Sequence, residues 1–328
     1  MAIADAIIPL ESLDKKDRLI LYELDRDSRQ SNAEIGKNTK IDKNTVAYRI
    51  NALMKEKILL GFYAVIDPTK FGRRSYRSYL KFNYCEPEKR KEIIDFVCSE
   101  PRNWWVGTID DYWDICIGYF SEDPYDFQEF WQKLMEKYQD LVRDRNVSLY
   151  LKVYDFNYAF LSPEKNPKKE CFEVGFRGNA KISENERKVL SAISKNARLP
   201  TIEIAALTKL TPAMVKHAIK KLKDLKIIVG FRARIDIAKL GLTHYKINFY
   251  LKDREKYKKM VDFAMQHPKV IYIDEAIGYA DFEIEALFSS HTEFKELVAE
   301  MQKLFGDKIK DYNYYIYDRI YRINYFEK

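Results

Sequence analysis

The sequence has little glycine, proline or cysteine. Of its 328 residues, 11 are glycine, 10 are proline and 4 are cysteine. No glycine-rich stretch has the spacing of a phosphate-binding loop, so nucleotide chemistry has little support. The cysteines form no C-x-x-C pair and no tight cluster with histidine, which argues against a disulfide framework or a structural zinc. We therefore expect neither a metal nor an organic cofactor.

Long hydrophobic runs are also missing, because charged residues interrupt every apolar stretch. No segment therefore reads as a membrane span. The first 13 residues carry Asp5 and Glu11 without a basic stretch, unlike a secretory signal peptide. A chain with 33% charged, 46% hydrophobic and 14% aromatic residues is typical of a globular protein of two or more domains. We expect a cytoplasmic protein without a membrane partner.

An internal repeat organises the chain. Residues 13–72 match residues 182–241 at a constant shift of 169 positions, and 19 of the 60 positions are identical. A gapless match of this length indicates a duplication. The element pattern that follows each copy also repeats. The sequence predicts domains at residues 1–72, 73–160, 182–241 and 242–328, with a charged, proline-containing linker at residues 161–181.

Each repeated unit begins with a segment that predicts three helices and a wing. In the first copy Asp42 is suited to cap a third helix that buries Val46, Ile50 and Leu53. In the second copy Thr211 and Pro212 open the equivalent helix. An apolar strand with a reversal at Gly61-Phe62 or Gly230-Phe231 follows. This order describes a winged helix-turn-helix, whose third helix fits the major groove of DNA.

The outward residues of the third helices are the candidates for DNA contact. They are Lys216, His217, Lys220 and Lys221 in the second copy, and Lys43, Asn44, Tyr48 and Arg49 in the first. Arg232 and Arg234 on the second wing are expected to contact phosphates, because they alternate onto one face of a strand.

The two winged helix-turn-helix segments, called the heads below, differ in net charge. Residues 182–241 hold 13 basic and 5 acidic side chains, which is a net charge of +8. Residues 1–72 hold 12 basic and 11 acidic side chains. DNA affinity depends largely on neutralised phosphates, so double-stranded DNA is the expected partner, and the second head the stronger binder.

The tail of each unit predicts a β-α-β-β-α-β order, which is the ferredoxin-like pattern. In the first copy the strands are expected at residues 76–84, 103–110, 112–120 and 146–157, and in the second at 245–251, 270–276, 280–287 and 309–325. Tyrosines on both faces of the last strand imply that both faces are covered, one by helices and one by another sheet. The predicted fold is α+β: two tandem copies of a winged helix-turn-helix followed by a ferredoxin-like domain.

The chain resembles the Lrp/AsnC family of transcription regulators. The matching stretches are LDKKDRLIL at residues 13–21, NAEIG at 32–36 and KILLGFYAVID at 57–67. The resemblance implies a DNA-binding regulator that self-associates through its ferredoxin-like sheets and can bind an amino acid or another small effector. Here the two halves are expected to pair as a pseudo-dimer within one polypeptide.

In that family the effector region looks like a G-x-x-D turn between the second and third tail strands. The second copy has it at Gly278 and Asp281, whereas the first has Asp111 in place of the glycine, followed by Asp114. The resemblance therefore implies effector contacts from Gly278, Asp281 and, with less support, Asp114. An ordinary hairpin turn is the alternative reading of the same residues.

Two other functions stay open at this stage. One is an architectural or partner-binding protein in which only the second head holds DNA. The other is an enzyme similar to the siroheme decarboxylases, which share the architecture but have a His-Asn-Tyr segment before the third tail strand. Residues 103–108 and 270–274 contain no histidine. Carboxylate pairs such as Glu283/Glu285 show no convergent partner in the sequence, so we expect no enzymatic activity.

Overall fold

A computed structural model describes residues 7–175 and 178–326 of the chain. The outermost residues of the first and last predicted domains, 1–6 and 327–328, and residues 176–177 of the predicted linker lie outside the described residues. Among the helices that are described, none combines the length and the apolar character needed to cross a membrane.

Both heads contain the three predicted helices. These are α1 (Lys15–Arg26), α2 (Asn32–Thr39) and α3 (Lys43–Lys55) in the first head, and α6 (Glu184–Lys195), α7 (Thr201–Thr208) and α8 (Pro212–Asp224) in the second. The predicted caps are confirmed: the Asp42 carboxylate accepts the backbone N–H groups of Asn44 and Thr45, and the Thr211 hydroxyl accepts that of Met214.

Both tails have the predicted β-α-β-β-α-β order, which confirms the fold class. The first tail contains β2 (Arg74–Phe82), α4 (Pro87–Ser99), β3 (Asn103–Asp110), β4 (Ile115–Ser121), α5 (Pro124–Tyr138) and β5 (Val142–Phe156). The second contains β8 (Thr243–Leu251), α9 (Tyr257–Gln266), β9 (Val270–Ile277), β10 (Phe282–Phe288), α10 (His291–Phe305) and β11 (Ile309–Ile323).

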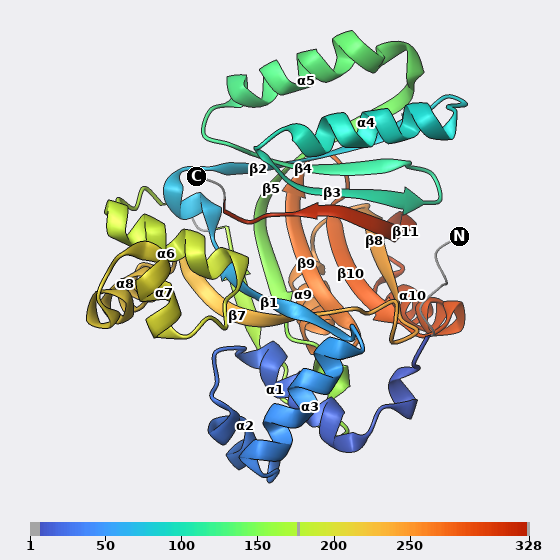
Figure 1. Ribbon diagram of the computed structural model, residues 1–328. Coiled ribbons are helices and arrows are strands. Elements are labelled where there is room, and N and C mark those ends of the chain that lie inside the picture. Colours follow the sequence, from blue (N-terminus) through green and yellow to red (C-terminus); the bar gives the residue numbers. More distant parts are fainter. Residues whose placement is uncertain (1–6, 176–177, 327–328) are drawn as a thin grey trace.

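The two tails join edge to edge into a closed barrel. Strand β3 pairs with β11, β5 pairs with β9, and β2 also pairs with β5, so the eight tail strands form a complete ring. The helices of each tail pack on the outside: β2–β4 bury apolar side chains against α4 and α5, and β8–β10 against α9 and α10 (Figure 1). The tails therefore associate within one chain as predicted, but they do so by pairing of edge strands around a common interior and not by one sheet covering the face of the other.

The predicted wing hairpins are wrong. Strands β1 (Leu59–Ile66) and β7 (Ile228–Ile235) run straight through Gly61-Phe62 and Gly230-Phe231 and pair antiparallel with each other. Each copy thus supplies one strand of a single two-stranded sheet. A hairpin is not required here, because the equivalent strand of the other copy supplies hydrogen-bond partners for the backbone N–H and C=O groups.

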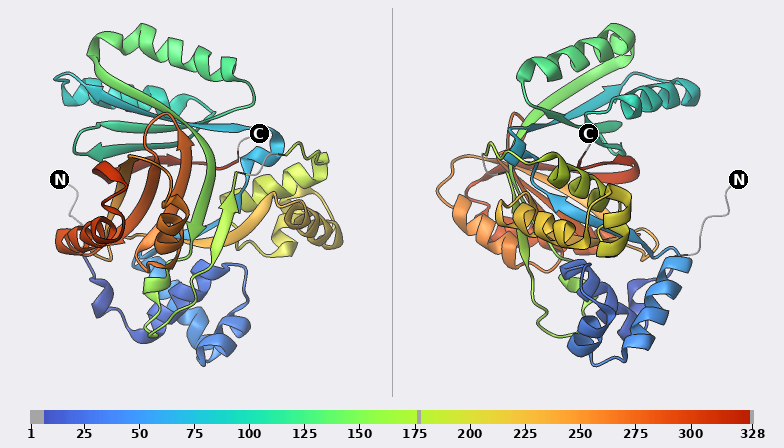
Figure 2. Two further views of the ribbon diagram at one scale, coloured as in Figure 1. Left: turned by 180° about the vertical axis from the view of Figure 1, so that it is seen from behind. Right: turned by 60° about the vertical axis from the view of Figure 1, so that its left-hand side comes forward.

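The two heads are held together by contacts that repeat across the pseudo-twofold relation. Arg29 donates to the carbonyl of Ala197, and its counterpart Arg198 donates to that of Ser28. Each guanidinium also lies over a phenylalanine of the opposite copy. The heads share one hydrophobic core, so the chain forms the expected pseudo-dimer. Figure 2 shows the two sets of head helices on either side of the β1/β7 pair.

The predicted linker is partly built into the fold. Strand β6 (Cys171–Val174) pairs with β5 and extends the sheet, and the Tyr22 hydroxyl of α1 donates to the carbonyl of Lys168. The described part of the linker therefore packs on the barrel and on α1, where its backbone groups find hydrogen-bond partners.

Candidate functional sites on the heads and in the barrel

Helix α8 presents an exposed basic face. Lys216, His217 and Lys220 are exposed and form no hydrogen bond or ion pair within the described part of the chain. Lys221 differs from the prediction, because its ammonium group lies 2.8 Å from the Glu186 carboxylate of α6. Three of the four residues predicted in this helix are therefore free to meet a ligand.

Helix α3 offers a weaker version of the same face. Lys43, Asn44 and Tyr48 are exposed, and Tyr48 is 74% exposed. Arg49 was expected beside them, but its guanidinium lies 2.9 Å from Asp17 and 3.3 Å from Asp14. Arg49 thus ties α3 to the beginning of α1 instead of pointing outward.

Arg232 does not lie on an exposed wing, which corrects the prediction. Its side chain is fully buried and forms ion pairs with Asp25 of α1 and Asp155 of β5. Burial raises the pKa of Asp155 to about 7 despite the neighbouring guanidinium. Arg232 is internal because β7 pairs with β1 and packs between α1 and β5, which supply its two carboxylate partners. Arg234, two residues later, is exposed and lines a cavity.

The G-x-x-D turn of the second copy and the equivalent D-x-x-D turn of the first perform the same structural task. Asp281 accepts the backbone N–H of Leu251 at 2.9 Å, and Asp114 accepts that of Phe82 at 2.8 Å. Gly278 has φ 114°, and a Cβ there would lie 2.7 Å from the Val147 carbonyl oxygen. These contacts fit a hairpin turn. Effector binding by Gly278, Asp281 and Asp114 stays a prediction.

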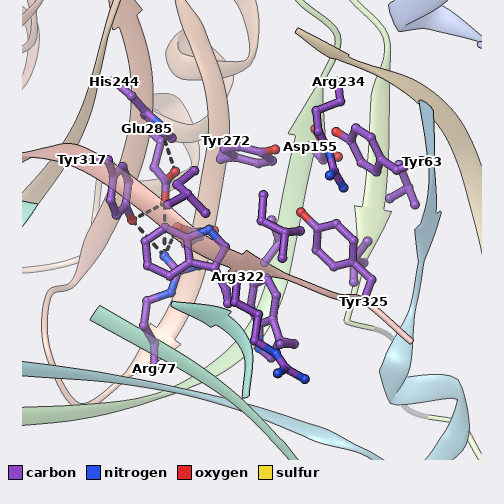
Figure 3. A pocket seen from close by; sticks show the side chains of 18 of the residues that line it. Tyr63, Arg77, Asp155, Arg234, His244, Tyr272, Glu285, Tyr317, Arg322 and Tyr325 are labelled. Carbon is purple, nitrogen blue, oxygen red and sulfur yellow. Dashed lines mark hydrogen bonds and ion pairs between the residues drawn. The ribbon is translucent and has the colours of Figure 1, made fainter. Parts of the chain in front are cut away.

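A cavity of about 870 Å³ lies where the barrel interior meets the β1/β7 pair. Figure 3 shows its labelled side chains arriving from both copies and converging on one space. Residues from β1 and β7 form one side, the inner faces of the barrel strands form another, and the end of β11 crosses between them. None of the three predicted effector residues lines this cavity.

A network of buried charges lines the inner part of this cavity. The Glu285 carboxylate accepts hydrogen bonds from Arg77 at 3.1 Å and from the Tyr317 hydroxyl at 3.2 Å, and lies 2.8 Å from His244 Nε2 (Figure 3). Burial opposes ionisation of Glu285, but Lys246, His244 and Arg77 outweigh it and hold the pKa of this carboxyl well below its usual value. Glu285 is therefore a buried anion surrounded by cations.

Lys246 supplies the second centre of this network. Its ammonium group lies 2.7 Å from Glu283, forms an ion pair with Asp274, and donates to the Tyr150 hydroxyl at 2.9 Å. Burial lowers the pKa of Lys246, but the neighbouring carboxylates outweigh it, so the pKa is raised. No partner for Glu283 and Glu285 is apparent in the sequence. In the barrel both carboxylates face Lys246, and Glu285 also faces Arg77 and His244.

The first copy replaces this acidic wall with aromatic rings. Arg77 of β2 faces Gly118 of β4, whereas Lys246 of β8 faces Glu285 of β10 at the corresponding position of the other tail. A Cβ at Gly118 would lie 2.7 Å from the Trp104 ring, and one at Gly107 would lie 2.5 Å from the Trp105 ring. The glycines thus let two tryptophans lie flat on the inner sheet face.

Sequence reasoning missed Arg77, His244 and Lys246 as members of a site. The available signal was a charged residue at alternate positions of the apolar strands β8 and β10, because such charges face an interior when the other face packs on helices. The structure shows no group of three or more His, Cys, Asp or Glu side chains arranged to hold a metal among residues 7–175 and 178–326.

Comparison with known proteins identifies the heads and the overall fold. The family described as winged helix-turn-helix DNA-binding matches residues 13–59 and 182–229. An uncharacterized HTH-type transcriptional regulator of Pyrococcus horikoshii is 29% identical over 147 residues, which cover 45% of this chain and 91% of that protein. The proline dehydrogenase transcriptional activator of Rhodobacter capsulatus is 28% identical over 39% of this chain and 80% of its own length.

A solved structure matches the whole tandem arrangement. The siroheme decarboxylase NirDL aligns with a TM-score of 0.64 and 12% identity over 96% of this chain and 95% of that chain. Its complex with an iron-uroporphyrin III analogue aligns with a TM-score of 0.63. At this identity the match shows the fold alone. The chain is a tandem protein in which two regions that match the winged helix-turn-helix model are each followed by a ferredoxin-like unit.

Proposed function

We propose that this protein is a DNA-binding transcription regulator of the Lrp/AsnC type and not an enzyme. The observation that carries the proposal is the face of α8, where Lys216, His217 and Lys220 are exposed and unpaired within the described residues. They belong to the head with the net charge of +8. The names of the matching relatives, which are transcription regulators, support the same function. A small molecule, such as an amino acid, is proposed to tune DNA binding.

The salt dependence of DNA binding tests this proposal. Each lost phosphate contact flattens the slope of log K against log[salt] by about 0.9. We expect Lys216→Ala combined with Lys220→Ala to flatten the slope by about 1.8 and to weaken binding, as measured by fluorescence anisotropy with genomic DNA fragments. Lys258→Ala combined with Lys259→Ala changes two exposed lysines of α9 and is the matched control.

Either of two results would contradict the assignment. One is an unchanged slope in the α8 variant, and the other is an equal loss in the α9 control. Sequencing the bound fragments separates a regulator from an architectural protein, because a regulator enriches one motif whereas an architectural protein gives the steep slope without a motif.

An enzyme similar to the siroheme decarboxylases is the second candidate. It is favoured by the structural match over 96% of the chain and by His244, which brings a histidine into the cavity from β8 although the expected segments have none. Incubation with siroheme, followed by absorbance spectroscopy and measurement of released carbon dioxide, decides between the candidates. A perturbed tetrapyrrole spectrum followed by release of carbon dioxide would replace the regulator proposal with the enzyme.

A further inference from the structure

The cavity between barrel and heads has two chemically different walls. The first tail contributes the rings of Trp104 and Trp105. Trp104 stacks on Phe120 with ring centroids 5.1 Å apart, and Tyr325 is tilted against it at 5.4 Å. The second tail contributes a polar wall that contains the buried carboxylate of Glu285 and the imidazole of His244. Ligand pockets of this kind combine apolar area with a few fixed polar groups. Such a space suits a flat aromatic molecule with a polar edge.

The outer part of the cavity has cations without carboxylate partners. Arg234 and Arg319 line it, are exposed, and form no ion pair within the described residues. Three of the six lining carboxylates already face a cation: Asp155 faces Arg232, Asp274 faces Lys246, and Glu285 faces Arg77. The other three are Asp110, Asp236 and Asp318; Asp236 accepts the backbone N–H of Lys239, and Asp318 accepts a hydrogen bond from the Thr108 hydroxyl. The unpaired guanidinium groups favour an acidic group on the ligand.

We infer that this cavity is a binding site for a flat aromatic acid, with the ring system on Trp104 and Trp105 and the acidic group toward Arg234 and Arg319. The site differs from the G-x-x-D turns, whose carboxylates already bind backbone N–H groups. The sequence alone could not predict this site, because its walls come from strands of both copies.

The same cavity reaches the heads. Tyr63 of β1 and Arg234 of β7 lie on its outer side, and both strands belong to the sheet that joins the heads (Figure 3). A ligand that contacts β7 and β11 together favours one arrangement of heads and barrel over others, and it therefore changes DNA affinity. This coupling rests on the proposed DNA-binding function, whereas the binding site itself does not.

Binding of 8-anilinonaphthalene-1-sulfonate to the full chain tests the site. This dye is an aromatic anion with a planar naphthalene ring system; its fluorescence rises in apolar surroundings, and it can accept excitation energy from tryptophan. We expect saturable binding with energy transfer, and affinity reduced at least about tenfold in Arg234→Glu and in Arg319→Glu. Arg143→Glu makes the same charge change at an exposed position of β5 outside the cavity and is expected to bind like the wild type.

The outcomes separate the site from its coupling to DNA. Equal dye affinity in the wild type and both cavity variants would overturn the inferred site, as would tighter binding of the flat cation thioflavin T than of the anionic dye. A dye that binds as expected but leaves DNA affinity unchanged would overturn only the coupling. Absence of DNA binding in every condition would overturn the proposed function and leave the ligand site standing.

Discussion

Two arginines two positions apart show how far the environment decides the role of a residue. Arg232 and Arg234 are on the same strand and were expected to contact phosphates together, yet Arg232 is fully buried between Asp25 and Asp155 while Arg234 is exposed. The carboxylates that hold Arg232 are 207 and 77 positions away. No local pattern reveals partners at such separations, so the burial of Arg232 was beyond sequence reasoning.

The two arginines are expected to differ in their effect on stability. Arg232→Ala leaves two buried carboxylates without their cation, and it should lower the free energy of unfolding by about 3–5 kcal/mol. Arg234→Ala removes an exposed side chain and should change it by less than about 0.5 kcal/mol. Urea unfolding followed by circular dichroism measures both. Equal effects of the two substitutions would show that Arg232 does not serve as the buried counterion described here.

At the scale of elements, periodicity and capping predicted nearly every helix and strand. Asp42 and Thr211 cap the third helices as expected, and β3 begins and ends at the predicted residues. The predicted pairing partners of the wing strands were wrong. The sequence of β1 is equally compatible with a hairpin and with a strand that pairs with β7, because both satisfy the same alternation of side chains. Choosing between them requires the position of the other copy.

The hairpin between β3 and β4 contains a strained residue that can be tested. Asp111 has φ 120°, whereas its counterpart in the second copy is Gly278 with φ 114°. A non-glycine residue in this region costs on the order of 1–3 kcal/mol. We therefore expect Asp111→Gly to raise the free energy of unfolding by about 1 kcal/mol.

The neighbouring position provides the control for this prediction. Asp110 is the last residue of β3 and has no positive φ. Asp110→Gly should lower stability by about 0.5–1 kcal/mol, because glycine gains freedom in the unfolded chain. Chemical denaturation of both variants gives the comparison. A destabilised Asp111→Gly would mean that the aspartate side chain contributes more to the turn than its backbone strain removes.

At the scale of the whole molecule, duplication turned a dimer interface into an intramolecular one and then let the two copies diverge. The barrel needs both tails, since β3 pairs with β11 and β5 with β9. The interior nevertheless differs between them: glycines under tryptophans in the first tail, carboxylates around Lys246 in the second. A symmetric dimer of one unit could not combine these walls in one cavity. The candidate ligand site is therefore a property of the fused chain.

The dependence of each half on the other can be measured with the chain cut at the linker. Residues 1–175 and 178–328, expressed as two polypeptides, each expose the edges of β1 or β7 and of two barrel strands. Unpaired edges favour association with another chain. We expect co-expressed halves to elute as one complex in a 1:1 ratio by size-exclusion chromatography with light scattering, and each half alone to self-associate or aggregate. Arg198→Ala in the second half, which removes one reciprocal contact between the heads, should weaken the complex. Two halves that elute as separate monomers would show that strand exchange and barrel closure contribute little to holding the molecule together.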